Sequence, residues 1–155
     1  MIDEIALQKL RRYCAYQDRC HQEVRSKLIS IKVYGDDLEE IISELIREDF
    51  LNEERFARSY ARGKFRLKSW GRNKIKQQLK VRRISEYCMK KAMEEIDETA
   101  YTETLKAILE KQMLKHDNLK FLVARDKAIQ YSISRGYETG LVYDIAREIK
   151  EENKQ

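Results

Sequence analysis

Apolar residues recur at helical spacing along most of the chain. A clear example lies between Asp36 and Arg47, where the spacing i, i+3, i+4 and i+7 is typical of a helix with one buried face and is occupied by Leu38, Ile41, Ile42 and Leu45. The chain has no proline and only five glycines, so little interrupts helix propagation, whereas sheets and hairpins need more turn residues. The pattern therefore predicts an all-α protein without a sheet.

The same apolar pattern occurs three times. A shift of 51 residues aligns the first copy with the second and places Ile5 on Phe56, Val24 on Ile75, Leu28 on Leu79 and Leu38 on Met89. A further shift of 52 to 53 residues carries Leu79 to Tyr131, Ile84 to Tyr137, Met89 to Val142 and Ile96 to Ile149. Self-similarity at a fixed period of this length indicates related structural units.

Each copy is predicted to form three helices, which gives repeats over residues 1–51, 52–98 and 99–155. The first copy has helices near 5–17, 20–30 and 36–47, and the third has helices near 101–114, 119–134 and 138–151. In the second copy, residues suited to capping precede the helices, namely Asn52, Ser69 and Ser85. Because a unit of about 50 residues buries only a small core by itself, the repeats are expected to stack into an elongated body.

Charge is distributed unevenly along the chain. The net charge is +5, but residues 36–54 sum to −8 and residues 55–83 to +12. The second segment has no acidic residue and twelve basic ones: Arg55, Arg58, Arg62, Lys64, Arg66, Lys68, Arg72, Lys74, Lys76, Lys80, Arg82 and Arg83. A merely solvated helix face would normally mix both signs, since i,i+4 ion pairs then form. This basic segment is therefore predicted to bind phosphates or an acidic protein surface.

Four arginines of the basic segment share one side of the predicted helix over residues 53–67. At 100° per residue, this stripe consists of Arg55, Arg58, Arg62 and Arg66. The opposite, inward face is predicted to hold Phe56, Tyr60, Gly63 and Leu67. Arginine forks match phosphates and carboxylates alike, so nucleic acid and an acidic protein groove both stay open as partners. Phe65 and Trp70 could stack on bases, but core packing explains them more simply.

The sequence contains no recognisable catalytic set. The glycines stand singly, so there is no glycine-rich phosphate loop, and neither His21 nor His116 has a serine or cysteine partner at a recognised spacing. Cys14, Cys20 and His21 would point in different directions from a helix and have no fourth ligand, so buried thiols are the simpler interpretation. A non-enzymatic protein with no metal and no other cofactor is predicted.

Location is predicted from three features of the sequence. The first ten residues include two acids and no apolar stretch long enough for a signal peptide. No segment approaches the ~18 uncharged apolar residues of a membrane span. The three cysteines are odd in number and irregularly spaced, which is typical of a reducing compartment. The expected location is the cytoplasm, without a membrane partner.

Three segments resemble the bacterial RecX regulators. Residues 45–57, Leu-Ile-Arg-Glu-Asp-Phe-Leu-Asn-Glu-Glu-Arg-Phe-Ala, followed by Tyr60, resemble that family's signature, in which a Leu-Asn-Asp/Glu cap leads into an Arg-Phe-Ala helix. Residues 68–79 resemble its Lys-x-x-Gly-x-x-x-Ile-x-x-x-Leu pattern, and residues 23–28 resemble its Glu-Leu-x-x-Lys-Leu helix. The resemblance covers about residues 5–97, and the last third follows it only in its apolar pattern.

The chain departs from the family pattern at three places. Cys20 replaces the usual serine cap, Asp49 replaces a common glycine, and Arg82-Arg83 replaces a Lys-Gly pair. Arg83 therefore puts a side chain where a left-handed glycine is often used. None of these changes removes a catalytic group, because the family has none.

The resemblance implies a tandem array of three-helix repeats that binds within the groove of the RecA–DNA filament. Such a regulator would inhibit ATP hydrolysis and strand exchange, and so modulate recombination and DNA repair. The implied partners are the RecA nucleoprotein filament and, weakly through the basic segment, single- or double-stranded DNA, with the protein acting as a monomer. The alternative is a helical-repeat DNA-binding protein with no RecA partner, in which Arg72, Asn73 and Gln77 face the major groove. A purely structural scaffold would not need so dense a positive charge.

Overall fold

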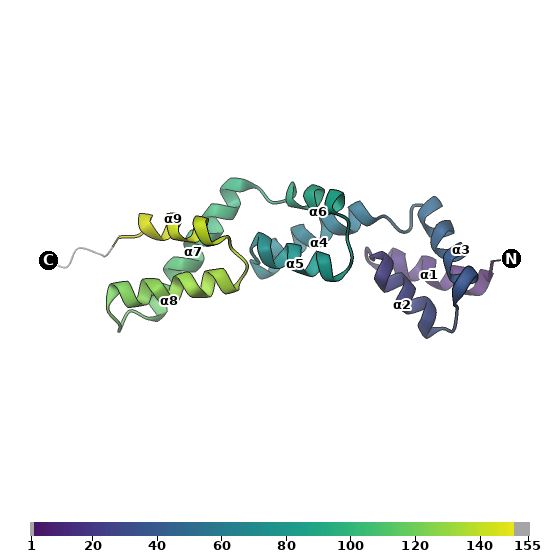
Figure 1. Ribbon diagram of the computed structural model, residues 1–155, viewed down its shortest axis with the longest axis horizontal. Coiled ribbons are helices and arrows are strands. Elements are labelled where there is room, and N and C mark those ends of the chain that lie inside the picture. The colour runs from purple at the N-terminus through teal and green to yellow at the C-terminus, as the bar shows by residue number, and fades with distance from the viewer. Residues whose placement is uncertain (1, 151–155) are drawn as a thin grey trace. The chain divides into compact units, whose positions relative to one another are not determined.

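The computed structural model describes residues 2–150, and over that range the chain is entirely helical, without a strand (Figure 1). The helices are α1 Glu4–Tyr16, α2 His21–Ser30, α3 Gly35–Arg47, α4 Glu53–Lys68, α5 Arg72–Val81, α6 Glu86–Met93, α7 Glu98–Lys115, α8 Phe121–Ser134 and α9 Thr139–Glu148. The prediction of an all-α protein is confirmed. The predicted helix bounds agree within one to three residues over the described range.

The residues form two compact units. The first unit holds the residues up to Tyr60 together with Gln78–Met93, and the second holds Ala61–Gln77 together with the described residues from Glu94 onward. Helices α4 and α5 thus contribute residues to both units. The predicted repeat boundaries at residues 51 and 98 stay a prediction, and the outermost residues of the first and third repeats, 1 and 151–155, lie outside the described range.

The core of the first unit follows the predicted stripes of α1, α2 and α3. Its fully buried residues include Leu10, Val24, Leu28, Ile41 and Leu45. One predicted match was wrong: Ile5 is 73% exposed, although its counterpart Phe56 is buried. Ile5 lies in the first turn of α1, on the side away from the core, and the inward positions there belong to Ala6 and Leu7.

The core of the second unit is built by α7, α8 and α9 around two buried aromatic rings. The ring centroids of Tyr101 and Tyr137 lie 4.9 Å apart. The sequence alignment matched the buried Leu79 with Tyr131, and this was wrong by one residue. Tyr131 is exposed, and the buried position is occupied by its neighbour Ser132. Ser132 satisfies its hydroxyl by donating to the Ala128 carbonyl at 2.9 Å, which allows a polar residue at this inward position.

Helix starts were predicted from capping residues with mixed success. Asn52 Oδ1 accepts the Arg55 N–H at 2.9 Å and Ser85 Oγ accepts the Cys88 N–H at 3.2 Å, so both predicted caps are confirmed. Ser69 was predicted to cap α5, and this was wrong: Ser69 directly follows α4, with a φ of 55°, and α5 begins only at Arg72. The first turn of α5 is capped by a residue of α7 instead: the Arg72 N–H donates to Tyr101 Oη at 2.9 Å.

Each repeat contains a residue with left-handed backbone just after its second helix. These residues are Lys32 with φ 65°, Arg83 with φ 58° and Gly136 with φ 101°. Asp49, the other position where a family glycine is replaced, also has a positive φ, of 63°. The backbone conformation that glycine favours is thus kept at Arg83 and Asp49, although each carries a side chain.

Candidate nucleic-acid interface

The first arginine of the predicted stripe, Arg55, forms ion pairs and hydrogen bonds with residues of the first unit. Its Nε lies 3.0 Å from Asp18 Oδ1, and its Nη1 lies 3.2 Å from Asp49 Oδ2. Its Nη2 also donates to the carbonyl of Asp49 at 2.9 Å. Arg55 therefore ties the start of α4 to the preceding turn, and much of its hydrogen-bonding capacity is used within the protein.

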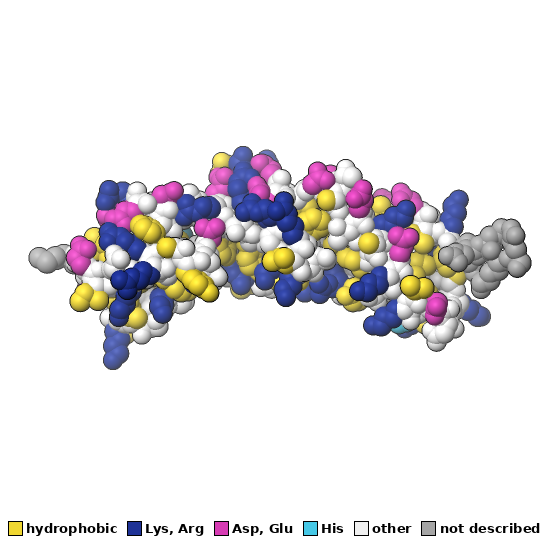
Figure 2. Space-filling view, turned by 180° about the vertical axis from the view of Figure 1, so that it is seen from behind, with side chains coloured by type: hydrophobic (Ala, Val, Ile, Leu, Met, Phe, Trp, Pro, Cys, Tyr) yellow, Lys and Arg dark blue, Asp and Glu magenta, His cyan; other side chains and the backbone are white. Residues whose placement is uncertain are grey.

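The next two arginines of the stripe also have acidic partners outside the basic segment. Arg58 Nε lies 3.0 Å from Glu54 Oε2, one helical turn away on α4. Arg62 Nη1 lies 2.5 Å from Glu95 Oε1, within the second unit. The absence of acids from residues 55–83 therefore does not leave these charges unbalanced, because carboxylates come from neighbouring parts of the chain. Figure 2 shows acidic side chains among the lysines and arginines over the middle of the chain.

Arg72 is more enclosed than the three other arginines of the basic segment that form ion pairs with carboxylates. Its side chain is only 16% exposed, and it pairs with Glu98 and, at 2.9 Å, with Glu138. Its guanidinium also lies over the Tyr101 ring, 3.9 Å from the centroid. Because two carboxylates and an aromatic face occupy this guanidinium, Arg72 stabilises the second unit and is poorly placed to read a DNA base.

Arg82 makes contacts within the first unit. Its Nη1 donates to the Gln78 carbonyl at 3.0 Å and to Gln78 Oε1 at 3.2 Å. Its guanidinium lies 4.9 Å from the centroid of the Tyr60 ring. With this residue, five arginines of the predicted site have structural partners within their own unit.

The two aromatic residues of the basic segment differ in their surroundings. Phe65 is buried, with its ring centroid 5.8 Å from that of Tyr101, so core packing is confirmed for it. Trp70 is half-buried, and the ammonium groups of Lys64 and Lys74 lie 4.9 and 4.6 Å from its ring. The indole face is therefore already shared by two cations of the second unit.

Five basic residues of the predicted site form no ion pair with a carboxylate among the described residues. In the second unit these are Arg66, Lys68 and Lys76, and in the first unit they are Lys80 and Arg83. Lys76 is half-exposed and the other four are exposed. Their charges are the ones available to an anionic partner without breaking an internal contact.

Leu67 was predicted to face inward, and this was wrong. Its side chain is 83% exposed, between the exposed cations Arg66 and Lys68. The buried face of α4 in the second unit follows Ala61 and Phe65 at the i, i+4 spacing, and a residue two positions beyond Phe65 points about 200° away from it. The end of α4 thus presents an apolar side chain flanked by two positive charges.

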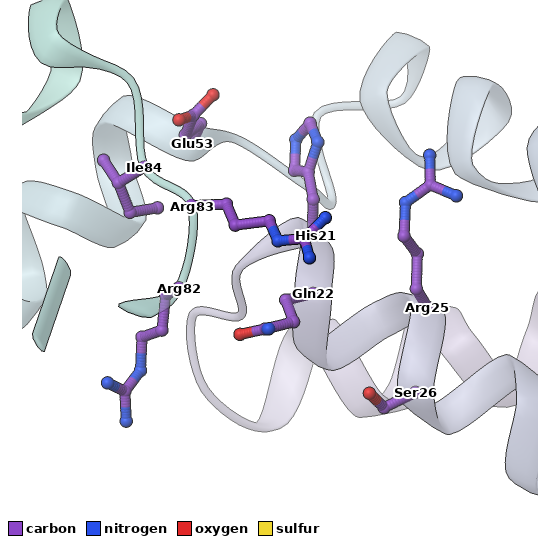
Figure 3. Close-up of a pocket in the computed structure, with 8 residues that line it drawn as sticks. All are labelled: His21, Gln22, Arg25, Ser26, Glu53, Arg82, Arg83 and Ile84. Atoms are coloured by element: carbon purple, nitrogen blue, oxygen red, sulfur yellow. The ribbon is translucent and has the colours of Figure 1, made fainter. Parts of the chain in front are cut away.

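A further pocket in the first unit was not found from the sequence. It has a volume of about 360 Å³ and is lined from α2 by His21, Gln22, Arg25 and Ser26, and from the chain after α5 by Arg82 and Arg83. Figure 3 shows Arg83 reaching toward the start of α2 beside His21, while Arg82 points away. Some sixty residues separate the two walls, so no local motif could indicate the pocket.

The cysteines and the possible metal ligands of the described residues can be compared with the predictions from the sequence. Cys14, Cys20 and Cys88 are buried free thiols, and burial raises the pKa of Cys14 to about 11, which keeps it protonated and unreactive. No three His, Cys, Asp or Glu side chains within residues 2–150 gather closely enough to hold a metal ion. None of the helices in this range has the length and hydrophobicity that a membrane span requires.

Comparison with known proteins gives one consistent result. Residues 52–93 match the family model described as RecX, second three-helix domain. The Regulatory protein RecX of Streptococcus uberis is 28% identical over 143 residues, which are 92% of this chain and 55% of the relative. The Regulatory protein RecX of Bacillus cytotoxicus is 24% identical over 90% of this chain and 52% of the relative. The chain therefore spans about half the length of these curated relatives.

Solved structures share the fold over nearly the whole chain. A RecX crystal structure from Lactobacillus salivarius matches with a TM-score of 0.86 at 24% identity and covers 94% of both chains. A second structure, of regulatory protein RecX, matches with a TM-score of 0.84 at 21% identity and covers 94% of this chain and 71% of the other. The matched domain at residues 52–93 contains the whole basic segment, residues 55–83. Residues 52–93 thus match the second three-helix domain of RecX, most of the chain is similar to regulatory RecX proteins, and the resemblance of its sequence motifs is confirmed.

Proposed function

We propose that this chain is a non-enzymatic regulator that binds the RecA–DNA filament and inhibits its ATP hydrolysis and strand exchange. Through that action it modulates recombination and DNA repair in the cytoplasm. Similarity to RecX proteins supports the class of function, because the relatives are named as regulatory proteins. The partner and the inhibitory step are the parts that need a test.

The observation that carries the proposal is the group of exposed cations at the end of α4 and on α5. Arg66, Lys68 and Lys76 belong to the matched family domain and lack an acidic partner among the described residues. Two of these cations, Arg66 and Lys68, flank the exposed Leu67 in the sequence, which suits a partner that offers both anions and apolar surface. A protein filament wrapped on DNA offers both, whereas DNA phosphates alone would leave Leu67 without a partner.

The competing function is a DNA-binding protein with no RecA partner. It needs Arg72, Asn73 and Gln77 to project from α5 into the major groove. Arg72 is held by Glu98 and Glu138 and lies over Tyr101. Two exposed residues, Asn73 and Gln77, are left for base contacts, which is a small set for sequence recognition.

The decisive experiment compares binding to RecA filaments with binding to the same DNA alone. In co-sedimentation, the protein should sediment with RecA filaments at concentrations where naked DNA does not retain it, and it should lower the ATP hydrolysis of the filament. A variant with Arg66→Glu, Lys68→Glu and Lys76→Glu should bind the filament at least about tenfold more weakly, because each lost phosphate contact removes counterion release.

A matched control is available on α7. Lys106, Lys111 and Lys115 are exposed lysines of the same unit, and their reversal to glutamate changes the net charge by the same amount. The control should bind the filament nearly as well as the parent. Equal losses in both variants would mean that bulk charge dominates, and equal affinity for filament and naked DNA would favour the DNA-binding alternative.

A further inference from the structure

The pocket between α2 and the turn after α5 has an unbalanced positive charge. Its lining includes three arginines and one acid, Glu53. The Glu53 carboxylate already accepts the Ser85 N–H at 2.7 Å. Two of the arginines are also engaged, since Arg25 donates to Glu39 at 2.5 and 3.1 Å and Arg82 donates to Gln78. The third, Arg83, has no carboxylate partner among the described residues.

The remaining polar groups in the lining can donate hydrogen bonds. Beside Arg83, the lining holds the imidazole of His21, the amide of Gln22 and the hydroxyl of Ser26. Figure 3 shows the Arg83 side chain extending to the start of α2, next to His21. A planar guanidinium with nearby amide, hydroxyl and imidazole donors is suited to an oxyanion. The volume of about 360 Å³ leaves space for the sugar attached to a phosphate.

The left-handed backbone conformation of Arg83 suggests that its side chain has a functional role. Arg83 has a φ of 58°, a conformation that costs an ordinary residue about 1 kcal/mol or more and that glycine adopts freely. The equivalent residue of the third repeat is Gly136. Strained residues of this kind are concentrated at functional sites, where the side chain is needed. Lys32 of the first repeat shares the conformation but lies outside the pocket lining.

We propose that this pocket binds a phosphate group of a DNA strand, with Arg83 as its main ligand and His21, Gln22 and Ser26 as further donors. The inference rests on the proposed function in one respect, that the partner contains DNA. A carboxylate would fit the guanidinium as well. Phosphate is favoured because Arg83 is the last residue of the segment 55–83, which has twelve basic residues and no acidic one. Clustered basic residues of this kind are typical of proteins that bind a nucleic-acid backbone.

The test uses the intact protein and a fluorescent single-stranded oligothymidylate, without RecA. Arg83→Gly should bind the oligonucleotide about fivefold more weakly near 0.1 M salt, with a salt slope shallower by about 0.7, as expected for one lost phosphate contact on a single strand. Lys32→Gly is the matched control, because it removes one positive charge from the equivalent left-handed turn outside the pocket. It should bind like the parent. Both variants should be at least as stable as the parent, so misfolding would not explain a loss.

A second arm identifies the anion. A polyglutamate peptide of equal charge should compete weakly, and its binding should be the same for the parent and for Arg83→Gly. Peptide binding that depends on Arg83 more than DNA binding does would overturn the phosphate assignment in favour of an acidic protein segment. Equal DNA affinity of the two glycine variants, or no measurable DNA binding by the parent, would overturn it too. RecA is absent, so normal filament binding beside such a result would leave the proposed function standing.

Discussion

Residues with a positive φ or a close backbone contact show which local conformations can be predicted from the sequence. Asp49 and Arg83 were recognised as replacing family glycines, and both have positive φ in the structure. Gly71 matches the glycine of the family's Lys-x-x-Gly pattern, but the pattern does not give the reason for a glycine there: a Cβ on Gly71 would lie 2.3 Å from the backbone carbon of Gly136. A motif can therefore mark a local conformation, whereas a close approach between the α4–α5 and α8–α9 connections depends on tertiary structure.

This close approach leads to a prediction for Gly71. Gly71→Ala should lower the free energy of unfolding by about 3 kcal/mol or more, because the obstacle is backbone and cannot rotate away. Gly63→Ala is the control: nothing lies within 4 Å of its Cβ, and alanine in the interior of α4 should add up to about 1 kcal/mol. Urea denaturation measures both. Similar effects at the two glycines would contradict the steric argument.

At the scale of elements, caps formed by neighbouring residues were predictable and caps formed by distant ones were not. Asn52 and Ser85 lie directly before their helices, so their roles follow from the sequence. The start of α5 depends on Tyr101, which is 29 residues away. Its hydroxyl accepts the Arg72 N–H and donates to Glu138. Local patterns favour Ser69 as the cap of α5, because they cannot indicate a partner as distant as Tyr101.

Tyr101→Phe should therefore destabilise the second unit. The change removes one hydroxyl that satisfies two partners, and leaving part-buried polar groups without partners costs about 1–3 kcal/mol. Tyr131→Phe alters an exposed tyrosine of the same unit and should change stability by less than about 0.5 kcal/mol. Thermal or urea unfolding would distinguish the two. Equal stability of the variants would mean that water replaces the hydroxyl without loss.

Glu138 should make the stability of the second unit depend on pH. Burial raises the pKa of this carboxyl, but hydrogen bonds from Tyr101 and Arg72 outweigh burial, and the net pKa lies below the ordinary value of 4.5. A carboxyl with a lowered folded-state pKa stabilises the fold above its unfolded pKa, and this contribution is lost as pH falls through the folded value. Unfolding measured between pH 7 and 3 should show this loss. In Glu138→Gln the dependence should be weaker, and an unchanged profile would assign it to other acids.

At the scale of the whole chain, the sequence gives the number of positive charges, but it does not show which of them are free of internal ion pairs and can contact a partner. Twelve cations and no acid in residues 55–83 suggested a continuous binding surface. The structure brings in Asp18, Glu95 and Glu138 from distant positions and pairs them with arginines of that segment. Charge segregation along the sequence thus predicts a binding region that lies within the matched family domain, but the partners of each arginine depend on tertiary structure.

This difference can be measured in the salt dependence of binding to duplex DNA. If all twelve cations contacted phosphates, the slope of log affinity against log salt would be about −11, from roughly −0.9 for each contact. Arg55, Arg58, Arg62, Arg72 and Arg82 have internal partners. Lys64 and Lys74 lie over the Trp70 ring. The other five cations set an expected limit of about −4.5.

Binding of a labelled duplex between 50 and 200 mM NaCl would give the slope. The variant with Arg66→Glu, Lys68→Glu and Lys76→Glu should lower its magnitude by about 3, because up to three contacts are lost. The α7 control at Lys106, Lys111 and Lys115 should leave the slope unchanged. A parent slope close to −11 would show that the internal ion pairs open on binding, in which case the paired arginines belong to the interface and the exposed group alone does not define it.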